Sequence, residues 1–324
     1  MLHSASVQEV FDAHLADVQQ VVRAAYLRYA AGFSVNPASH FLRFPDHPRD
    51  RIIALPARDR NERADRAGIK WISSFPGNVE AGLPRASAVI ILNDMGTGFP
   101  IACLEASAIS AARTAASAAL AARVLHPTTE GQVLGIVGCG PIARAVHQHL
   151  RADGWSFREI VLVDLVPARA EAFRAGLEED VRIVPSVQDA LDAADLMLFA
   201  TTAAEPHFLD ADGVHPRHTI LHLSLRDLGV GVLHRAQNIV DDPAHAIRES
   251  TSLGLAVERY GAELIAGTLA QVISAEVPAD PHRPRIFSPF GLGVLDLAVA
   301  GFVYDHAVRA GTAIEVHDFY APPS

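Results

Sequence analysis

The feature of the sequence that most restricts the fold is an alternation of short apolar runs and helical stretches that begins at Gln132. Helical stretches separate several of the runs, notably Pro141 to Arg151 and Pro167 to Gly176. The apolar runs are Val133 to Val137, Ile160 to Val163, Val181 to Val184, Leu196 to Phe199 and Thr219 to His222. This alternation predicts an α/β fold, with a doubly wound parallel sheet of the Rossmann kind.

The first of these strands runs into Gly138-Cys139-Gly140-Pro141-Ile142-Ala143, a pattern that predicts strand, tight turn and helix. Gly138 permits the turn, and Gly140 lets the backbone come close to a pyrophosphate, while Ala143 is small enough for the helix to pack on the strand. The start of the helix, at Pro141 and Ile142, offers unpaired N–H groups to phosphates. A glycine pair alone is a weak signal, since any strand-to-helix turn favours glycine.

The acid at the end of the second strand strengthens the prediction of a dinucleotide site. Asp164 follows Gly140 by 24 residues, and a carboxylate there accepts hydrogen bonds from both ribose hydroxyls of NAD but repels a 2′-phosphate. A solvated turn aspartate is the alternative, and Arg169 is near enough to leave NADP open. Thr201 and Thr202 follow the fourth strand, where a chain often passes the cofactor, although ordinary loop threonines fit equally well.

The rest of the chain predicts a second domain of α+β structure around this sheet. Residues Val7 to Ala31 have apolar groups at helical spacing, with Ser6 as N-cap and Gly32 as the stop. Further elements are strands at Arg51 to Leu55, Ala67 to Ile72, Ala86 to Leu92 and Pro100-Ile101, and helices at Leu104 to Leu125 and Leu292 to Ala310. We expect a substrate-binding and dimerisation domain at 1–125 plus about 294–324, and a NAD-binding Rossmann domain at 126–293.

Composition excludes several kinds of partner. The net charge of -10 argues against nucleic acid and anionic membranes, because both require clustered cations. The only cysteines are Cys103 and Cys139, so we expect no disulfide framework and a reducing cytoplasm. The N-terminus lacks the pattern of a signal peptide, and the sequence contains no metal-ligand cluster, nucleophile elbow or Walker loop. The expected partners are a small molecule and a cofactor.

Three cations lie in apolar surroundings of the first domain: Arg43, Lys70 and Arg113. A single cation of this kind usually reaches water or pairs with a carboxylate. Three of them in one domain indicate a pocket for an anionic substrate with several carboxylates, to which the arginine fork is suited. A desolvated lysine also serves as an acid or base, because burial lowers its pKa.

Asp227 follows the fifth strand of the alternating region, close to Ser224. Ligands of doubly wound sheets bind at the carboxyl ends of the strands, so Asp227 is a candidate for proton transfer opposite the nicotinamide and Ser224 for contact with the cofactor. Capping of the loop is the alternative role of Asp227. The neighbouring His218 and His222 are more often structural in such positions.

The chain resembles the ornithine cyclodeaminase/mu-crystallin family over nearly its full length. The matching stretches are Gly68-Ile69-Lys70-Trp71, Ser110 to Ser117, the Gly138 loop and Asp227. Within the family the chain is most similar to the N-(2-amino-2-carboxyethyl)-glutamate dehydrogenases of siderophore and antibiotic pathways. That similarity rests on Ile69 to Ile72, Arg85-Ala86-Ser87, Val89 to Asp94, Glu105-Ala106-Ser107, Val240-Asp241-Asp242 and Pro289 to Gly293.

The resemblance implies roles for individual residues. Arg43, Lys70 and Arg113 correspond to the carboxylate-binding cations of the family, with Lys70 also a proton-transfer candidate and Arg85 a further substrate contact. Asp227 corresponds to the catalytic aspartate, and Thr114 to a contact with the cofactor phosphates. The glutamate that holds the distal amine in ornithine cyclodeaminases is replaced here by Ile53, which weighs against ornithine.

The implied activity is NAD-dependent cleavage of N-(2-amino-2-carboxyethyl)-L-glutamate to 2,3-diaminopropionate and 2-oxoglutarate. An ornithine cyclodeaminase, ketimine reductase or alanine dehydrogenase on the same site is the first alternative. A crystallin-like nucleotide-binding protein with little turnover is the second. The family also implies a homodimer formed through the first domain.

Overall fold

The chain folds into two compact units in a computed structural model that describes residues 1–61, 64–248, 250–317 and 319–320. Unit 1 comprises Met1–Arg113 and Leu292–Ser324, and unit 2 comprises Thr114–Gly291. The first division falls inside helix α2 (Ser107–Leu125). The sequence pattern placed the two boundaries at residue 125 and near residue 294. Of the expected returning segment, residues 318 and 321–324 lie outside the described residues.

Unit 1 contains an antiparallel sheet in the order β1-β2-β3-β4-β5. Its strands are β1 (His40–Phe44), β2 (His47–Arg60), β3 (Asp65–Ser74), β4 (Ala86–Asp94) and β5 (Pro100–Glu105). Opposite residues of antiparallel strands point to the same face, so the buried Lys70 shares a face with its partners Leu55 and Ile90. This face therefore carries the core of the unit.

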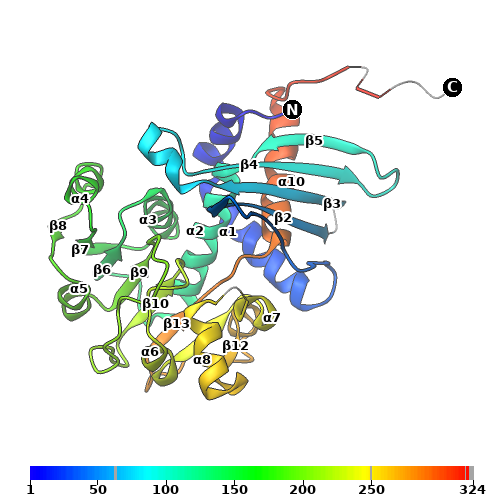
Figure 1. The fold of residues 1–324 in the computed structure, drawn as a ribbon. Helices are drawn as coiled ribbons and strands as arrows, with labels where there is room; N and C mark the ends of the chain where they lie inside the picture. The colour runs from blue at the N-terminus through cyan, green and yellow to red at the C-terminus, as the bar shows by residue number, and fades with distance from the viewer. Residues whose placement is uncertain (62–63, 249, 318, 321–324) are drawn as a thin grey trace. The chain divides into compact units, whose positions relative to one another are not determined.

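Two helices, α1 (Ser4–Ala30) and α10 (Gly293–Ala310), lie side by side, and α10 packs against β2, β3 and β4 (Figure 1). The predicted N-cap of α1 was wrong. His3 occupies that position and accepts a hydrogen bond from the Ser6 N–H, while the Ser6 hydroxyl donates to the Thr312 carbonyl at 3.1 Å. The helix ends next to Gly32, whose φ of 77° suits glycine.

Helix α2 begins at Ser107 and not at Leu104 as its alanine-rich composition predicted. Leu104 belongs to β5, where it pairs with Ile90 of β4. The Glu105 carboxylate accepts a hydrogen bond from the Ser107 N–H at 2.6 Å, directly at the start of the helix. Strand pairing thus overrides the local helix propensity of this segment.

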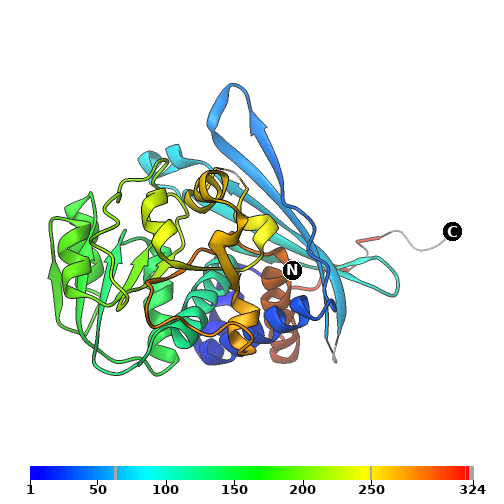
Figure 2. The same cartoon turned by 90° about the horizontal axis from the view of Figure 1, so that it is seen from below.

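Unit 2 contains an eight-stranded parallel sheet in the order β12-β11-β13-β10-β9-β6-β7-β8, coloured from green to orange in Figure 2. Its strands are β6 (Gln132–Val137), β7 (Phe157–Val163), β8 (Val181–Ile183), β9 (Leu196–Phe199), β10 (Thr219–His222), β11 (Gln237–Val240), β12 (Ile265–Thr268) and β13 (Arg285–Phe287). The first five were predicted, and the last three were not. The strand order reverses between β6 and β9, which is where ligands bind in such sheets.

Helices connect these strands and complete an α/β fold, which confirms the predicted class. They are α3 (Pro141–Ala152), α4 (Pro167–Arg174), α5 (Val187–Ala193), α6 (Val230–Arg235), α7 (Pro243–Ala246), α8 (Ser252–Tyr260) and α9 (Leu269–Ile273). Short 3-10 turns lie at Pro76–Ala81 in unit 1 and Ala262–Leu264 in unit 2. The core of unit 2 is apolar and includes Val137, Met197 and Ile220, all buried. A sheet covered in this way holds its carboxyl edge rigid for ligand binding.

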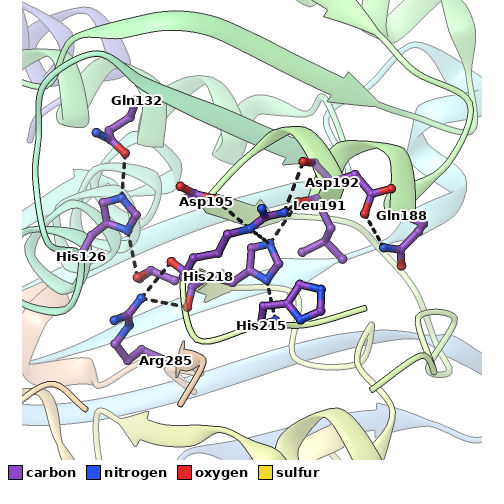
Figure 3. A network of polar contacts seen from close by, with 11 residues as sticks. His126, Gln132, Gln188, Leu191, Asp192, Asp195, His215, His218 and Arg285 are labelled. Carbon is purple, nitrogen blue, oxygen red and sulfur yellow. Dashed lines mark hydrogen bonds and ion pairs between the residues drawn. The ribbon is translucent and has the colours of Figure 1, made fainter. Parts of the chain in front are cut away.

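A polar network joins the amino ends of several strands of unit 2 (Figure 3). His126 contacts Thr219 Oγ1 and Gln132 Oε1 at 3.0 Å each. His218 contacts the Leu191 carbonyl at 3.0 Å, and Arg285 donates to the His218 carbonyl at 3.3 Å. Burial lowers the pKa of His218 to about 4 and also lowers the pKa of His126, so both imidazoles are neutral at pH 7. These histidines therefore have a structural role at the edge opposite the glycine turn.

Candidate active site

The glycine turn lies between β6 and α3. Gly138 has φ of 91°, and a Cβ there would lie 2.8 Å from the Ala200 carbonyl oxygen at the end of β9. The Gly138 N–H donates to the Val163 carbonyl at 2.8 Å, which ties the turn to the end of β7. Only glycine meets both conditions at this position.

Gly140 forms the N-cap of α3, and Pro141 occupies the first turn. A Cβ on Gly140 would meet nothing within 4 Å, so the backbone at this point is open to a ligand. A hollow of about 360 Å³ lies there, lined by Cys139, Gly140, Pro141, Arg144, Ala145 and Gln148. The free N–H groups and the helix dipole favour an anion such as a pyrophosphate at this place.

Asp164 lies at the end of β7, beside the turn. Its Oδ2 accepts a hydrogen bond from the Cys139 N–H at 2.8 Å, and its Oδ1 accepts one from the Val166 N–H at 2.8 Å. These bonds fix the carboxylate next to the glycine turn, while the residue remains partly exposed. The position is compatible with the predicted contact to ribose hydroxyls.

Cys139, between the two glycines, is not a nucleophile. Burial, followed by the nearby Asp164 charge, raises the pKa of its thiol to about 12. The thiolate is the reactive form, so this side chain stays unreactive near neutral pH.

Asp227 lies in the loop after β10, and its side chain is fully buried. Thr201 and Ser224, which were predicted to contact the cofactor, both donate hydroxyl hydrogen bonds to its carboxylate. The ring nitrogen of His207 lies 2.9 Å from Oδ1, and that of His222 lies 3.4 Å from Oδ2. Asp227 is thus the centre of a polar cluster at the carboxyl edge of the sheet.

The charge state of Asp227 follows from these contacts. Burial alone would raise the pKa of the carboxyl, but hydrogen bonds from His222, Ser224 and Thr201 hold the pKa well below its usual range. The carboxylate is therefore ionised at any pH near neutrality. Leu225, in the same loop, has φ of 68°, a conformation that is uncommon for a residue other than glycine and is often found at functional sites.

In unit 1, Lys70 and Arg113 converge on a carboxylate that the sequence pattern did not single out. Lys70 Nζ lies 2.7 Å from Asp296 Oδ2, and Arg113 Nε lies 3.0 Å from Asp296 Oδ1. Lys70 also donates to Ser110 Oγ at 3.1 Å. The side chains of Asp296 and Lys70 are 0% and 2% exposed, so the pair is desolvated, whereas Arg113 retains 12% exposure. With Lys70 protonated, the two cations and the Asp296 carboxylate give the cluster a net charge of +1.

Burial lowers the pKa of Lys70 to about 8, with Asp296 opposing that effect and Arg113 adding to it. A lysine with this pKa is partly neutral in mildly alkaline solution. It can then accept or donate a proton, as general acid–base chemistry requires.

Further arginines line one end of the same sheet face. Arg43 pairs in register with Arg51, and Arg51 pairs with Ser74, so these side chains share the face of Lys70. Arg85 donates to Ser74 Oγ at 2.9 Å. Because Ser74 follows Lys70 by four residues, this row lies roughly 13 Å from Lys70 along the strand. We call Arg43, Arg51 and Arg85 the arginine row.

The positions between Lys70 and the arginine row are apolar. Ile53 lies between Arg51 and Leu55 on the same face and pairs with Ile72 of β3. Between Lys70 and the arginine row this face carries aliphatic side chains and no acid in the paired positions of β2 and β3. Such a face suits a molecule with several separated carboxylates.

The structure brings together some predicted site residues and leaves others apart. Lys70 meets Arg113, and Asp227 meets Thr201 and Ser224. Arg43 is exposed, with its guanidinium carbon 5.0 Å from the centre of the Phe41 ring. Thr114, Ile142 and Thr202 are at least partly exposed, and their predicted contacts with the cofactor stay predictions.

Four residues of these clusters were missed. Asp296 and Ser110 gave no local signal, because each joins Lys70 only through folding. Arg51 was recognisable as part of a strand, but only the antiparallel pairing of β1 with β2 places it beside Arg43. His207 lies outside the named strands and helices, where sequence periodicity carries no information.

The described residues contain neither a candidate metal site nor a candidate membrane span. In that part of the chain, no group of three or more His, Cys, Asp or Glu side chains is arranged to hold a metal ion. Across the same residues, no helix has the length and apolar character needed to span a membrane.

A parallel sheet with a glycine turn, and a second sheet with buried and exposed cations on one face, define a nicotinamide-dinucleotide oxidoreductase for a small anionic molecule. The profile of the ornithine cyclodeaminase/mu-crystallin family matches residues 1–311. The chain belongs to this family and is an enzyme of the NAD(P)-dependent amino-acid oxidoreductase type. The family resemblance in the sequence is thereby confirmed.

Several relatives cover most of the chain. Alanine dehydrogenase of Archaeoglobus fulgidus is 29% identical over 94% of each chain. The ketimine reductase mu-crystallin of Mus musculus is 31% identical over 79% of this chain and 80% of its own. The N-((2S)-2-amino-2-carboxyethyl)-L-glutamate dehydrogenase of Staphylococcus aureus is 27% identical over 98% of each chain.

Solved structures share the fold of this chain. An archaeal alanine dehydrogenase dimer with bound NAD has a TM-score of 0.88 at 26% identity and covers 98% of each chain. The Thermococcus litoralis Delta(1)-pyrroline-2-carboxylate reductase, in complex with NADH and L-proline, has a TM-score of 0.89 at 23% identity, over 97% of this chain and 99% of its own. The expected NAD cofactor agrees with the NAD bound in the archaeal alanine dehydrogenase.

Proposed function

We propose that the chain catalyses the NAD-dependent oxidative cleavage of N-(2-amino-2-carboxyethyl)-L-glutamate to 2,3-diaminopropionate and 2-oxoglutarate. This substrate is a secondary amine with three carboxylates. The observation that carries the proposal is the distribution of cations on one sheet face of unit 1. Lys70 and Arg113 lie at one place, and the arginine row lies at another.

The distribution favours a long polyanion over a small amino acid. Asp296 already neutralises one of the two cations at its cluster, which leaves one charge for a single carboxylate. The arginine row supplies binding capacity for further carboxylates through the bidentate fork. Alanine, with one carboxylate, would leave the row unused.

The apolar stretch on this face argues against ornithine. A distal ammonium group needs an acid, and Ile53 and Ile72 offer none. The relative from S. aureus, whose name describes the proposed reaction, aligns with 98% of this chain. Its similarity supports the same substrate.

The proposed reaction divides into oxidation and hydrolysis. Hydride leaves the glutamate Cα for NAD, which supplies the oxidising power when bound, and the substrate becomes an iminium ion. Arg43 and Arg113 hold carboxylates, and Arg85 adds a contact. Lys70 and Asp227 assist the proton transfers in which water adds to the iminium carbon and the C–N bond breaks.

The family leaves two alternative candidates for this site. Alanine dehydrogenase and ketimine reductase are the names of relatives at 29% and 31% identity, so either reaction, or an ornithine cyclodeamination, on the same site is the second candidate. A crystallin-like protein that binds the nucleotide with little turnover is the third. The buried Lys70, with its pKa lowered to about 8, disfavours the third, because binding alone needs no acid–base group.

A homodimer through unit 1 belongs to the same proposal. The sheet face opposite Lys70 exposes four large apolar side chains: Leu42, Trp71, Val89 and Ile101. Large apolar side chains exposed on one sheet face are typical of a protein interface. The archaeal alanine dehydrogenase is described as a dimer, which makes a second copy the favoured partner. A cytoplasmic place in siderophore or antibiotic biosynthesis is part of the proposal.

Product analysis tests the reaction. The purified enzyme is incubated with NAD and N-(2-amino-2-carboxyethyl)-L-glutamate, and the mixture is analysed by mass spectrometry. We expect equal amounts of 2-oxoglutarate and 2,3-diaminopropionate. Unchanged substrate, together with conversion of ornithine to proline and ammonia in a parallel sample, would contradict the proposal.

A further inference from the structure

A partly exposed histidine is attached to the buried Asp227 in unit 2. His207 Nε2 lies 2.9 Å from Asp227 Oδ1, and the side chain of His207 is 39% exposed whereas that of Asp227 is 0% exposed. The backbone holds the same pair: the N–H groups of His207 and Phe208 donate to the Asp227 carbonyl at 3.0 and 2.9 Å. The position of this imidazole is therefore fixed by three contacts with one residue.

The Asp227 carboxylate has no free approach for a substrate. Thr201 and His207 contact Oδ1, Ser224 donates to Oδ2, and His222 Nε2, which accepts from the Asp227 N–H, lies 3.4 Å from Oδ2. A carboxylate has about four lone-pair sites, and these four side chains surround them. His207 is the most exposed side chain of the cluster, whereas Thr201 and Ser224 are only partly exposed, so a water or amine that exchanges a proton at this place meets the His207 ring.

The tautomer of His207 follows from the charge of its partner. Asp227 is ionised, because its hydrogen bonds hold its pKa well below the usual range in spite of burial. An ionised carboxylate only accepts hydrogen bonds, so Nε2 of His207 carries the proton and donates it. Nδ1 then carries the lone pair, and it makes no hydrogen bond within residues 1–61, 64–248, 250–317 and 319–320.

We infer that His207 is the catalytic base and acid of the hydrolytic half-reaction, and that Asp227 acts through it as a positioning residue. The inference rests on the proposed function. Histidine paired with a buried carboxylate is a common arrangement for proton transfer, since the carboxylate fixes the ring and stabilises the imidazolium that forms.

The proton transfers balance as follows. As the oxygen of water bonds to the iminium carbon, its O–H bond breaks and the proton passes to Nδ1, while the π pair becomes the lone pair of the nitrogen. Nδ1 returns that proton to the nitrogen, and the C–N bond breaks. The hydroxyl loses its proton to solvent as the C=O bond forms, which leaves 2-oxoglutarate and the amine.

Two variants separate this role from a structural one. In His207→Gln, the amide nitrogen can still donate to Asp227 Oδ1, but no group remains to take the proton. In His207→Ala, the space next to Asp227 is open to added imidazole. His282→Gln is the matched control, because His282 is an exposed histidine of the same unit. Thermal melting and NADH titration show whether each variant is folded.

The measurement is rapid mixing of enzyme, NAD and N-(2-amino-2-carboxyethyl)-L-glutamate. Hydride transfer precedes hydrolysis, so we expect His207→Gln to form one NADH per site at the wild-type rate and then to turn over at least about a hundredfold more slowly. Imidazole should restore turnover to His207→Ala but not change His282→Gln, which behaves as wild type.

Distinct outcomes overturn the two claims. Steady-state turnover of both His207 variants within twofold of wild type, or a first turnover of His207→Gln as slow as the later ones, overturns the role of His207. If the wild-type enzyme itself forms no NADH, the proposed function fails, and the inference fails with it. The wild-type sample therefore distinguishes the two failures.

Discussion

Lys70 and Asp296 form a fully buried ion pair, with Nζ 2.7 Å from Oδ2, across 226 residues of sequence. Asp296 lies in the first turn of α10, where the helix dipole favours a negative charge. The same carboxylate binds Arg113, so it positions both cations and limits their combined charge. Removing one partner of such a pair leaves a buried charge, which is strongly destabilising.

Asp296 should therefore control the protonation of Lys70. Burial and Arg113 lower the pKa of Lys70, and Asp296 raises it, so loss of the negative charge in Asp296→Asn lowers that pKa further. If neutral Lys70 is the active form, activity rises with pH through its pKa. We expect this rise near pH 8 in the wild type and about one to three units lower in the variant. The pH dependence of kcat/KM measures the shift.

Asp305→Asn provides the control, because Asp305 lies on the same helix and pairs with Arg66 at 2.7 Å. Its profile should coincide with that of the wild type. An Asp296→Asn profile that also coincides with the wild type would show that Asp296 does not tune Lys70.

Gly138 is expected to be indispensable for the nucleotide. In Gly138→Ala the new Cβ meets the Ala200 carbonyl at 2.8 Å, in a backbone conformation that alanine disfavours. We expect a loss of more than about 1–2 kcal/mol in the free energy of unfolding and little NADH binding. Urea denaturation and fluorescence titration measure the two effects.

Gly131→Ala separates the effect of backbone strain from the effect of a steric clash of the new Cβ. Gly131 also has a positive φ, 62°, but a Cβ there meets nothing within 4 Å. This variant should lose about 1 kcal/mol and keep its affinity for NADH. Equal NADH affinity in both variants would show that the turn at Gly138 does not form the nucleotide site.

Asp164 should determine the choice between NAD and NADP. Asp164→Ser removes the charge that repels a 2′-phosphate and the acceptor for ribose hydroxyls. We expect the ratio of kcat/KM for NAD over NADP to fall by about tenfold or more. In the control Glu171→Gln, which removes an exposed acid of α4, the ratio should not change. If Asp164→Ser keeps the wild-type ratio, Asp164 is a solvated residue of the turn and does not select the cofactor.

The dimer is tested by charge on the exposed sheet face. Trp71, 41% exposed, pairs with Val89 of the neighbouring strand. Trp71→Glu places a charge among apolar side chains, so sedimentation should show a monomer where the wild type is a dimer. Val308→Glu, on the exposed side of α10, should leave the dimer intact. A Trp71→Glu variant with wild-type mass would exclude this face as the interface.

Local signals made the nucleotide half of the molecule predictable. The turn at Gly138 and the acid at Asp164 follow from the short-range geometry of one strand–helix–strand unit, which any chain of this pattern must adopt. Asp296 could not be predicted as the partner of Lys70, because their contact depends on how α10 packs on the sheet. The start of α2 was misplaced for a similar reason, since pairing of Leu104 with Ile90 prevails over its helix propensity.

The rate of NADH formation tests the central claim most directly. Near-ultraviolet absorbance is followed with NAD and N-(2-amino-2-carboxyethyl)-L-glutamate, beside samples with ornithine and with alanine. We predict robust formation with the first substrate alone, its loss in Lys70→Ala, and a steady-state rate in Asp227→Ala far below that of the wild type. No absorbance change with that substrate, but NADH from alanine or proline and ammonia from ornithine, would contradict the account and assign a different amino acid to this site.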